Sequence, residues 1–282
     1  MKPKVIAIAG PTASGKTKMA VDLAKKINGE VVSADSRLVY RGFNIASAKP
    51  TLEEREGIPH YMIDIVEPEY DYSVGDYYES AKKVIAGIIR RNKTPIVAGG
   101  TGLYFRILLE NYDLPRVEAD FGLRAELNKR DKEDLLNEIK VSDKISYERL
   151  KDSDKRRIVR ALEVMKVLNQ PFSEVCNLKE PEYDVAWLCP KMKSREWLYE
   201  RINKRVDLMV EQGIVDETKY LLKKHGRIKN FTETIGYKEI LSYLDGETTL
   251  EEALDKLKQH SRNYAKRQLT WFRKNPALNI EI

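Results

Sequence analysis

Cysteine and histidine are scarce in this sequence of 282 residues. Its two cysteines, Cys176 and Cys189, lack the spacing of metal ligands, and the histidines at 60, 225 and 260 are too scattered to complete a zinc site with them. The sequence also contains no uninterrupted apolar run of about 20 residues, the length that crosses a bilayer. These absences argue against a disulfide-stabilised protein, a zinc protein and a membrane protein.

The N-terminal segment, MKPKVIAIAGPTASGK, contains a short apolar run. The run ends in a glycine loop and lacks the small-residue cleavage site of a secretion signal. We therefore expect it to be part of the fold and the protein to be cytoplasmic.

The charge of the chain is positive, with a net value of +6 at pH 7. Such a charge favours polyanionic partners through electrostatic attraction and counterion release. Many basic proteins bind no nucleic acid, so the charge alone does not identify a partner.

Apolar runs of strand length alternate with helical patterns along much of the chain. Residues 5–9 form the first such run, and after a glycine loop the apolar residues between 19 and 27 recur at helical spacing. Further strand candidates lie at 30–33, 60–66, 95–98 and 185–189. This alternation predicts an α/β fold with a mostly parallel sheet flanked by helices.

The organisation into domains follows from changes in this pattern. Residues 110–154 read as short, highly charged helical segments, which predicts a small helical insertion. Beyond residue 194 the pattern is almost wholly helical. Because single cores stop growing at roughly 250–300 residues, we expect one main α/β core, formed by 1–109 and 155–282, with a helical C-terminal part.

A phosphate-binding loop follows the first predicted strand. Residues 10–17 read GPTASGKT and satisfy the pattern G-x-x-x-x-G-K-[ST], and a helix pattern begins directly after them. Backbone amides and the Lys16 ammonium are expected to surround a di- or triphosphate, and the Thr17 hydroxyl to bind Mg²⁺. The loop does not reveal which phosphate ester it binds. The residues expected to bind the diphosphate are Gly10, Pro11, Thr12, Ala13, Ser14, Gly15, Lys16 and Thr17.

Further sequence blocks resemble a known enzyme family. In chain order they are SADSRLVYRG at 33–42, AKP at 48–50, HYMID at 60–64, GGTGLYF at 99–105, RALEV at 160–164, RINKRV at 201–206, IGYKE at 235–239 and YAKRQLTWF at 264–272. Together these blocks resemble the bacterial tRNA dimethylallyltransferases, also called tRNA isopentenyltransferases, over nearly the whole chain. The GGTGLY and YAKRQLTWF blocks are distinctive of that family.

The resemblance implies a P-loop NTPase-like fold and a specific reaction. A dimethylallyl group would pass from dimethylallyl diphosphate to the exocyclic amine of the adenosine 3′ of the anticodon in tRNA, giving isopentenyladenosine and diphosphate. The partner would be the tRNA anticodon stem-loop, with the 110–154 insertion clamping the anticodon arm. We also expect a monomer.

Two residues at predicted strand ends are candidates for catalysis. Asp35 follows the second predicted strand, at the sheet edge where open α/β proteins bind ligands. Its position fits a general base and a turn-capping aspartate equally well, and the resemblance favours the base. Thr101 lies in a glycine-rich turn at another strand end, where the resemblance favours a contact with substrate over a plain turn threonine.

Arg205 is a third catalytic candidate. On a helix at 197–212 it falls at the edge of an apolar stripe, so its guanidinium either binds an anion or extends to solvent or to a local carboxylate. The resemblance favours a contact with the diphosphate. The stripe consists of Leu198, Ile202, Val206 and Met209.

Two helical patterns carry basic faces that RNA phosphates would suit. At 153–170, Ile158, Leu162, Met165 and Leu168 are expected to be buried, with Arg156 and Arg160 opposite them. In the C-terminal pattern Leu257, Tyr264 and Trp271 share one face, and Arg262, Lys266 and Arg273 share another. Charged faces are usually only solvated. With the resemblance, the expected tRNA contacts are Asp35, Ser36, Arg37, Leu38, Thr101, Arg124, Arg156, Arg157, Arg160, Lys266, Arg267 and Gln268.

The sequence departs from the family pattern in three places. Arg156 and Leu38 stand where the family commonly has glutamine, which changes the kind of RNA contact available there. The insertion is also shorter than the family pattern leads us to expect.

Two other functions compete with the prenyltransferase. An ATP-dependent small-molecule or nucleoside kinase would use the same loop. However, the strand predicted at 95–98 is followed by glycines, and only Asp64 could replace the metal-binding aspartate that a kinase usually has there. A non-catalytic RNA-binding regulator would use nucleotide as a switch, and it would not need Asp35 or Thr101.

Overall fold

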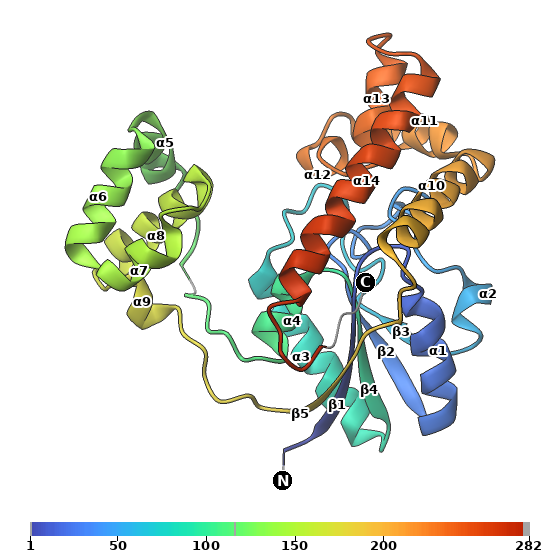
Figure 1. Ribbon diagram of the computed structural model, residues 1–282, viewed down its shortest axis with the longest axis horizontal. Coiled ribbons are helices and arrows are strands. Elements are labelled where there is room, and N and C mark those ends of the chain that lie inside the picture. Colours follow the sequence, from blue (N-terminus) through green and yellow to red (C-terminus); the bar gives the residue numbers. More distant parts are fainter. Residues whose placement is uncertain (1, 116, 279–282) are drawn as a thin grey trace. The chain divides into compact units, whose positions relative to one another are not determined.

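The computed structural model describes residues 2–115 and 117–278, and the chain divides into two compact units (Figure 1). The first comprises Met1–Leu109 and Glu182–Ile282, and the second comprises Glu110–Pro181. The expected insertion therefore begins where the sequence placed it, but its end at 154 is wrong. Residues 155–181 belong to the second unit because Ile158 and Leu162 share a buried core with Leu127, Leu135 and Ile139.

The first unit is built on a five-stranded sheet, and every adjacent pair of its described strands is parallel. The strand order is β3-β2-β4-β1-β5. The α/β fold with a P-loop-type parallel sheet is thus confirmed. The strands are β1 (Lys4–Ala9), β2 (Gly29–Ala34), β3 (His60–Tyr61), β4 (Thr94–Gly99) and β5 (Asp184–Leu188).

One strand is much shorter than its apolar pattern. The sequence predicted a strand over 60–66, but β3 ends at Tyr61. Met62 and Asp64 have φ angles of 63° and 55°, in the left-handed region that a strand cannot contain. The chain therefore turns directly after two paired residues.

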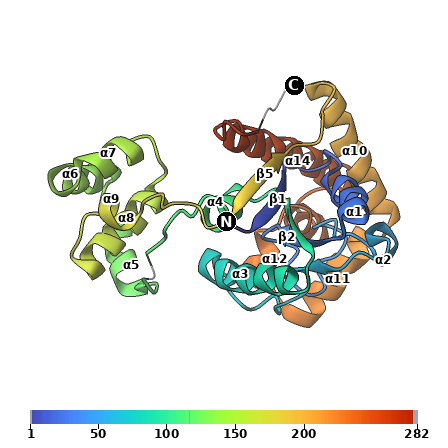
Figure 2. The same cartoon turned by 90° about the horizontal axis from the view of Figure 1, so that it is seen from below.

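Helices cover both faces of this sheet. Helix α1 (Lys16–Ile27) packs through Ala20 and Ala24 against Ile8, Val31 and Ile96 of the strands. Figure 2 shows α3 (Val74–Arg90) on the other side of the sheet. The remaining helices before the second unit are α2 (Leu52–Arg55) and α4 (Gly102–Leu108).

The C-terminal part of the first unit is helical after β5, as expected. Tyr237, from the IGYKE block, donates to Glu217 at 2.6 Å, and Glu217 also accepts from the backbone N–H of Ile45. This block therefore fastens the loop around residue 45. The helices are α10 (Arg195–Glu211), α11 (Ile214–His225), α12 (Lys229–Thr232), α13 (Tyr237–Leu244) and α14 (Leu250–Phe272).

The second unit consists of short helices around the core that contains Leu135 and Ile158. Asp120, Asp143 and Asp154 begin three of these helices by accepting hydrogen bonds from backbone amides of the first turn. The helices are α5 (Phe121–Lys129), α6 (Lys132–Ser142), α7 (Lys144–Leu150), α8 (Lys155–Leu168) and α9 (Phe172–Val175). Over residues 2–115 and 117–278, no helix has both the length and the apolar character needed to cross a membrane.

Candidate diphosphate and acceptor site

The phosphate loop lies between β1 and α1, as its sequence predicts. Gly15 has a φ of +95° and leads into α1, so the first amides of the helix face the loop. Lys16 Nζ donates to the carbonyl oxygen of Pro11 at 2.5 Å, which folds the side chain back along the loop. The Ser14 hydroxyl is buried and has no hydrogen-bond partner among the described residues. The loop thus presents unsatisfied donors to a ligand.

Two cations meet at this loop. Arg205 Nη1 donates to Thr12 Oγ1 at 2.9 Å, and the charge of Arg205 acts on Lys16. Burial, and to a smaller extent this repulsion, lowers the pKa of Lys16 from 10.5 to about 8. Burial also lowers the pKa of Arg205. Two half-buried cations close together are unfavourable unless an anion binds between them. The pair therefore indicates an anion site.

Arg205 reaches the loop from α10. The stripe of Leu198, Ile202, Val206 and Met209 is buried as the sequence predicts, and it fixes the rotation of the helix. One turn earlier, Arg201 Nε donates to the carbonyl oxygen of Ala13 at 2.7 Å. The Arg205 side chain is thus directed at the phosphate loop and is not free in solvent.

Asp35 and Thr101 meet at the carboxyl ends of β2 and β4, which are neighbouring strands. Thr101 Oγ1 accepts a hydrogen bond from the backbone N–H of Ser36 at 3.1 Å, and the Thr101 amide donates to the carbonyl of Ala34 at 3.0 Å. The charge of Asp35 raises the pKa of Lys16 and of Arg205, against their overall shifts. The carboxylate therefore lies within electrostatic reach of both cations.

The Asp35 side chain serves two purposes at once. Its Oδ1 accepts from the backbone N–H of Arg37 at 2.8 Å, which is the turn-capping bond that the sequence left open. Within the described part of the chain, Oδ2 accepts no hydrogen bond and stays available to a proton donor. The turn and the general-base interpretations are compatible, one for each oxygen.

Tyrosines that the sequence reasoning missed surround this edge of the sheet. Tyr104 stacks on Tyr77 with ring centroids 3.7 Å apart, and burial raises the pKa of both hydroxyls. Tyr264 of α14 lies beside Thr101, and burial, with a smaller effect of the Asp35 charge, raises the pKa of its hydroxyl to about 12. Tyr104 lies in the GGTGLYF block and Tyr264 in the YAKRQLTWF block. Membership of these family-like blocks was the only feature of the sequence that pointed to a place in the site.

Few protein groups at this loop could act as ligands for Mg²⁺. The Thr17 side chain is exposed in the first turn of α1, and no group of three or more His, Cys, Asp or Glu residues in the described parts of the chain could hold a metal ion. A hydroxyl beside a phosphate loop fits Mg²⁺ only when phosphate and water oxygens complete the coordination. The Thr17 site is therefore compatible with the ion solely in the presence of a phosphate ester.

The expected RNA residues of α14 separate into two groups. Lys266 and Arg267 are exposed, and Arg267 lies over the Tyr264 ring. Gln268, in contrast, is only 5% exposed, and both ends of its side-chain amide form hydrogen bonds with the protein backbone. Arg262 donates to Asn203, so it is also engaged within the protein.

The expected RNA residues of the second unit are divided in the same way. Glu163 is fully buried and accepts from Arg160 at 2.6 Å and from Arg124 at 2.9 Å, and these bonds contribute to holding the pKa of its carboxyl below the usual value. Arg160 therefore does not share a free face with Arg156, contrary to the sequence prediction. Arg156 and Arg157 are exposed. The buried face of α8 also differs, since Leu168 is 38% exposed and Val159 takes its place.

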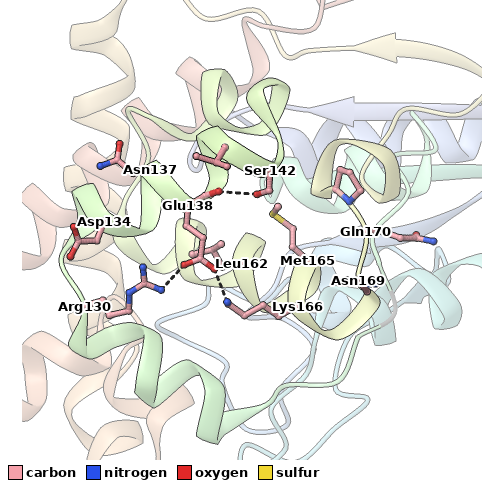
Figure 3. Close-up of a pocket in the computed structure, with 12 residues that line it drawn as sticks. Arg130, Asp134, Asn137, Glu138, Ser142, Leu162, Met165, Lys166, Asn169 and Gln170 are labelled. Carbon is pink, nitrogen blue, oxygen red and sulfur yellow. Dashed lines mark hydrogen bonds and ion pairs between the residues drawn. The ribbon is translucent and has the colours of Figure 1, made fainter.

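A cavity of about 760 Å³ lies between α6 and α8 in the second unit. Figure 3 shows Glu138 at its centre, where the carboxylate lies between Arg130 and Lys166 at 2.5 and 2.6 Å. Leu162 and Met165 form apolar parts of the wall. Because Glu138 is neutralised on both sides, it is not a free charge for a ligand.

Comparisons with known proteins agree with this geometry. Residues 38–275 match a family model described as IPP transferase, and residues 3–68 match one described as isopentenyl transferase. A tRNA dimethylallyltransferase of Anoxybacillus flavithermus is 43% identical over 277 residues, covering 97% of this chain and 88% of the relative. The enzyme of the same name from Halalkalibacterium halodurans is 44% identical over 280 residues, covering 97% and 89%.

Solved structures give the same result. A tRNA isopentenylpyrophosphate transferase from Bacillus halodurans has a TM-score of 0.73 and 42% identity, covering 99% of this chain and 90% of that one. A eukaryotic dimethylallyltransferase crystallised acting on tRNA has a TM-score of 0.79 and 31% identity, covering 96% and 70%. The match over residues 38–275 and these relatives along nearly the whole chain show that the protein belongs to the IPP transferase family.

Proposed function

We propose that this protein transfers a dimethylallyl group from dimethylallyl diphosphate to the exocyclic amine of the adenosine 3′ of the anticodon in tRNA. The observation that carries this proposal is that an anion site, formed by Lys16 and Arg205, lies within electrostatic reach of the carboxylate of Asp35, which follows β2. The names of the relatives support the same reaction.

The chemistry assigns the cations to the leaving group. The adenine nitrogen attacks the first carbon of the allyl group, the carbon–oxygen bond breaks, and its electron pair leaves with the diphosphate. Lys16 and Arg205 stabilise the negative charge that grows on the departing oxygen. At pH 7 the Lys16 ammonium is largely protonated, since its pKa is about 8.

Asp35 receives the proton that the attacking amine loses. Its Oδ1 is held by the Arg37 backbone N–H, so Oδ2 is the oxygen that takes the proton. Thr101 anchors the turn after β2 through the Ser36 amide and so fixes the direction of this carboxylate. Magnesium at Thr17, when bound with the diphosphate, would add to the charge neutralisation.

The acceptor has to leave its stack to reach this site. An adenine stacked in an anticodon loop hides its reactive edge, so we infer that the nucleotide is extruded towards Asp35 and Thr101. Exposed basic residues, among them Arg156, Arg157, Lys266 and Arg267, are proposed to hold the RNA phosphates. We further propose a monomeric enzyme that works in the cytoplasm, with the second unit clamping the anticodon arm.

The kinase alternative is disfavoured by the residues at the strand ends. Strand β4 ends at Gly99, where no carboxylate is available to bind a nucleotide-associated metal. Asp64, the possible substitute, is paired with Lys49, whose side chain is only 6% exposed. Asp64 therefore neutralises a buried lysine.

A labelling experiment tests the proposed function. The protein is incubated with unmodified tRNA and either dimethylallyl diphosphate labelled in the allyl group or ATP labelled in the γ-phosphate. We expect the allyl label alone to reach the RNA and Lys16→Ala to abolish that transfer. An ATPase activity that needs no tRNA and disappears in Lys16→Ala would instead support the kinase.

A further inference from the structure

Gln268 of α14 joins two loops of the candidate site. Its Oε1 accepts a hydrogen bond from the backbone N–H of Thr12 at 2.8 Å, and its Nε2 donates to the carbonyl oxygen of Gly100 at 2.9 Å. Thr12 belongs to the phosphate loop after β1, and Gly100 precedes Thr101 after β4. Since β1 and β4 pair directly, the buried amide connects the ends of two adjacent strands.

Helix α14 packs closely against these loops. A Cβ atom at Gly100 would lie 2.1 Å from Gln268 Nε2, and one at Gly102 would lie 2.1 Å from the Trp271 ring. Tyr264 lies beside Thr101. Residues 264, 268 and 271 share one helix face because they are spaced by four and three positions. One face of α14 thus contacts both loops.

The same geometry changes the role of Thr12. The sequence predicts that Thr12 binds the diphosphate, but its N–H is committed to Gln268 and its hydroxyl oxygen accepts from Arg205. Thr12 is therefore a link in a chain from Arg205 to Gln268 to Gly100. The groups at its ends are the anion site and the turn that carries Thr101.

We propose that Gln268 is a positioning residue that fixes the phosphate loop relative to the Thr101 turn, and so aligns the allyl diphosphate with the attacking amine. The inference rests on the proposed function. A carboxamide suits this position because it accepts from an N–H with one atom and donates to a carbonyl with the other. Displacing reacting groups by about 1 Å can cost roughly 10²-fold in rate.

The test compares Gln268→Met, which has a similar length but neither bond, with Gln259→Met, a substitution at an exposed glutamine of the same helix. Single-turnover transfer is measured with saturating donor and tRNA, pyrophosphate affinity by calorimetry, and folding by thermal unfolding. For Gln268→Met we expect transfer to slow by about 10²-fold while pyrophosphate affinity changes only a few-fold. Gln259→Met is expected to match the wild type in all three measurements.

Gln268→Glu separates positioning from simple packing. A protonated carboxyl group makes the same two hydrogen bonds as the amide, whereas a carboxylate cannot donate to Gly100. Burial raises the pKa of such a carboxyl, so the transfer rate of Gln268→Glu relative to wild type should recover as the pH falls from 8 to about 6. Gln268→Met should show no recovery.

Two results would overturn the inference. One is a Gln268→Met protein that transfers at the wild-type rate. The other is a transfer rate that falls only in proportion to a loss of melting temperature or of pyrophosphate affinity. In that case Gln268 would be purely structural. A wild-type protein that modifies no tRNA contradicts the proposed function itself, and the inference falls with it.

Discussion

The two oxygens of Asp35 allow its two roles to be separated by one substitution. In Asp35→Asn the side-chain oxygen can still accept from the Arg37 amide, so the turn is kept while the basic oxygen is lost. We expect kcat to fall by about 10²–10⁴, the range for loss of a general base, with little change in tRNA affinity or melting temperature. Steady-state kinetics at saturating substrates measure this, and a near-normal kcat would leave Asp35 as a turn residue.

The lowered pKa of Lys16 predicts a dependence of donor binding on pH. Above about pH 8 the free protein loses the ammonium charge, so pyrophosphate affinity should fall between pH 7 and pH 9. Lys16→Arg keeps its charge throughout this range and serves as the comparison. Calorimetric affinities of the two proteins should diverge as the pH rises, and parallel curves would contradict the assignment.

The same shift has a consequence for stability with a defined sign. The pKa of Lys16 is about 8 in the folded protein, against 10.5 for an unperturbed lysine. Between these values the unfolded chain binds more protons, so this group makes the free energy of unfolding rise with pH. Burial of the charged side chain is thus unfavourable for folding.

Arg205 provides a third prediction at the level of single residues. Arg205→Ala removes one of two cations at the phosphate loop and the donor to Thr12. We expect kcat/KM for the prenyl diphosphate to fall by roughly 10²-fold, the loss seen when one donor to a developing anion is removed. Thermal unfolding is the control, and an effect confined to melting temperature would make the arginine structural.

The position of a single side chain can be predicted from the sequence when a local pattern determines it. The placement of Lys16, Asp35 and Arg205 was predictable, because a loop motif, a strand end and an apolar stripe each determine where the residue lies. The internal hydrogen bonds of Gln268 were not predicted because its partners, Thr12 and Gly100, are more than 160 residues away in the chain. No local pattern contains that information.

At the level of elements, α8 offers a matched pair of substitutions. Arg156 is exposed, whereas Arg160 pairs with the buried carboxylate of Glu163. We expect Arg160→Glu to place two carboxylates together and to destabilise the second unit. Because Arg124 still bonds Glu163, part of the neutralisation of this buried carboxylate is kept.

Arg156→Glu should behave in the opposite way. It reverses a charge without an internal partner, so tRNA affinity should fall while hydrogen exchange in α5 and α8 stays as in the wild type. Arg160→Glu should accelerate that exchange. If Arg156→Glu left tRNA affinity unchanged, this face of α8 would be merely solvated.

Helical elements were predicted better than the short strand. The buried stripe of α10 was correct, because four apolar residues at regular spacing leave little choice of face. Strand β3 was overestimated, because nothing in HYMIDIV reveals that Met62 and Asp64 adopt positive φ angles. The C-terminal border of the insertion was also missed, since α8 carries an apolar stripe that fits either unit until its core partners are known.

For the molecule as a whole, the positive charge predicts how tRNA binding responds to salt. If the exposed cations Arg156, Arg157, Lys266 and Arg267 each neutralise one phosphate, affinity should fall by about 10²-fold between 50 and 200 mM salt. All six cations at 156, 157, 160, 262, 266 and 273 would give roughly 10³-fold. Filter binding over this range distinguishes the two values. A salt-independent affinity would exclude phosphate contacts as the main source of binding.

The packing of Trp271 against Gly102 gives the protein an optical reporter. The three tryptophans of the chain are Trp187 in β5, Trp197 beneath the Arg201 guanidinium, and Trp271, whose ring lies against the turn that carries Thr101. Indole emission depends on nearby charges and on contact with water. Filling the anion site should therefore alter the indole emission of the protein, so ligand entry can be followed in real time without any attached dye.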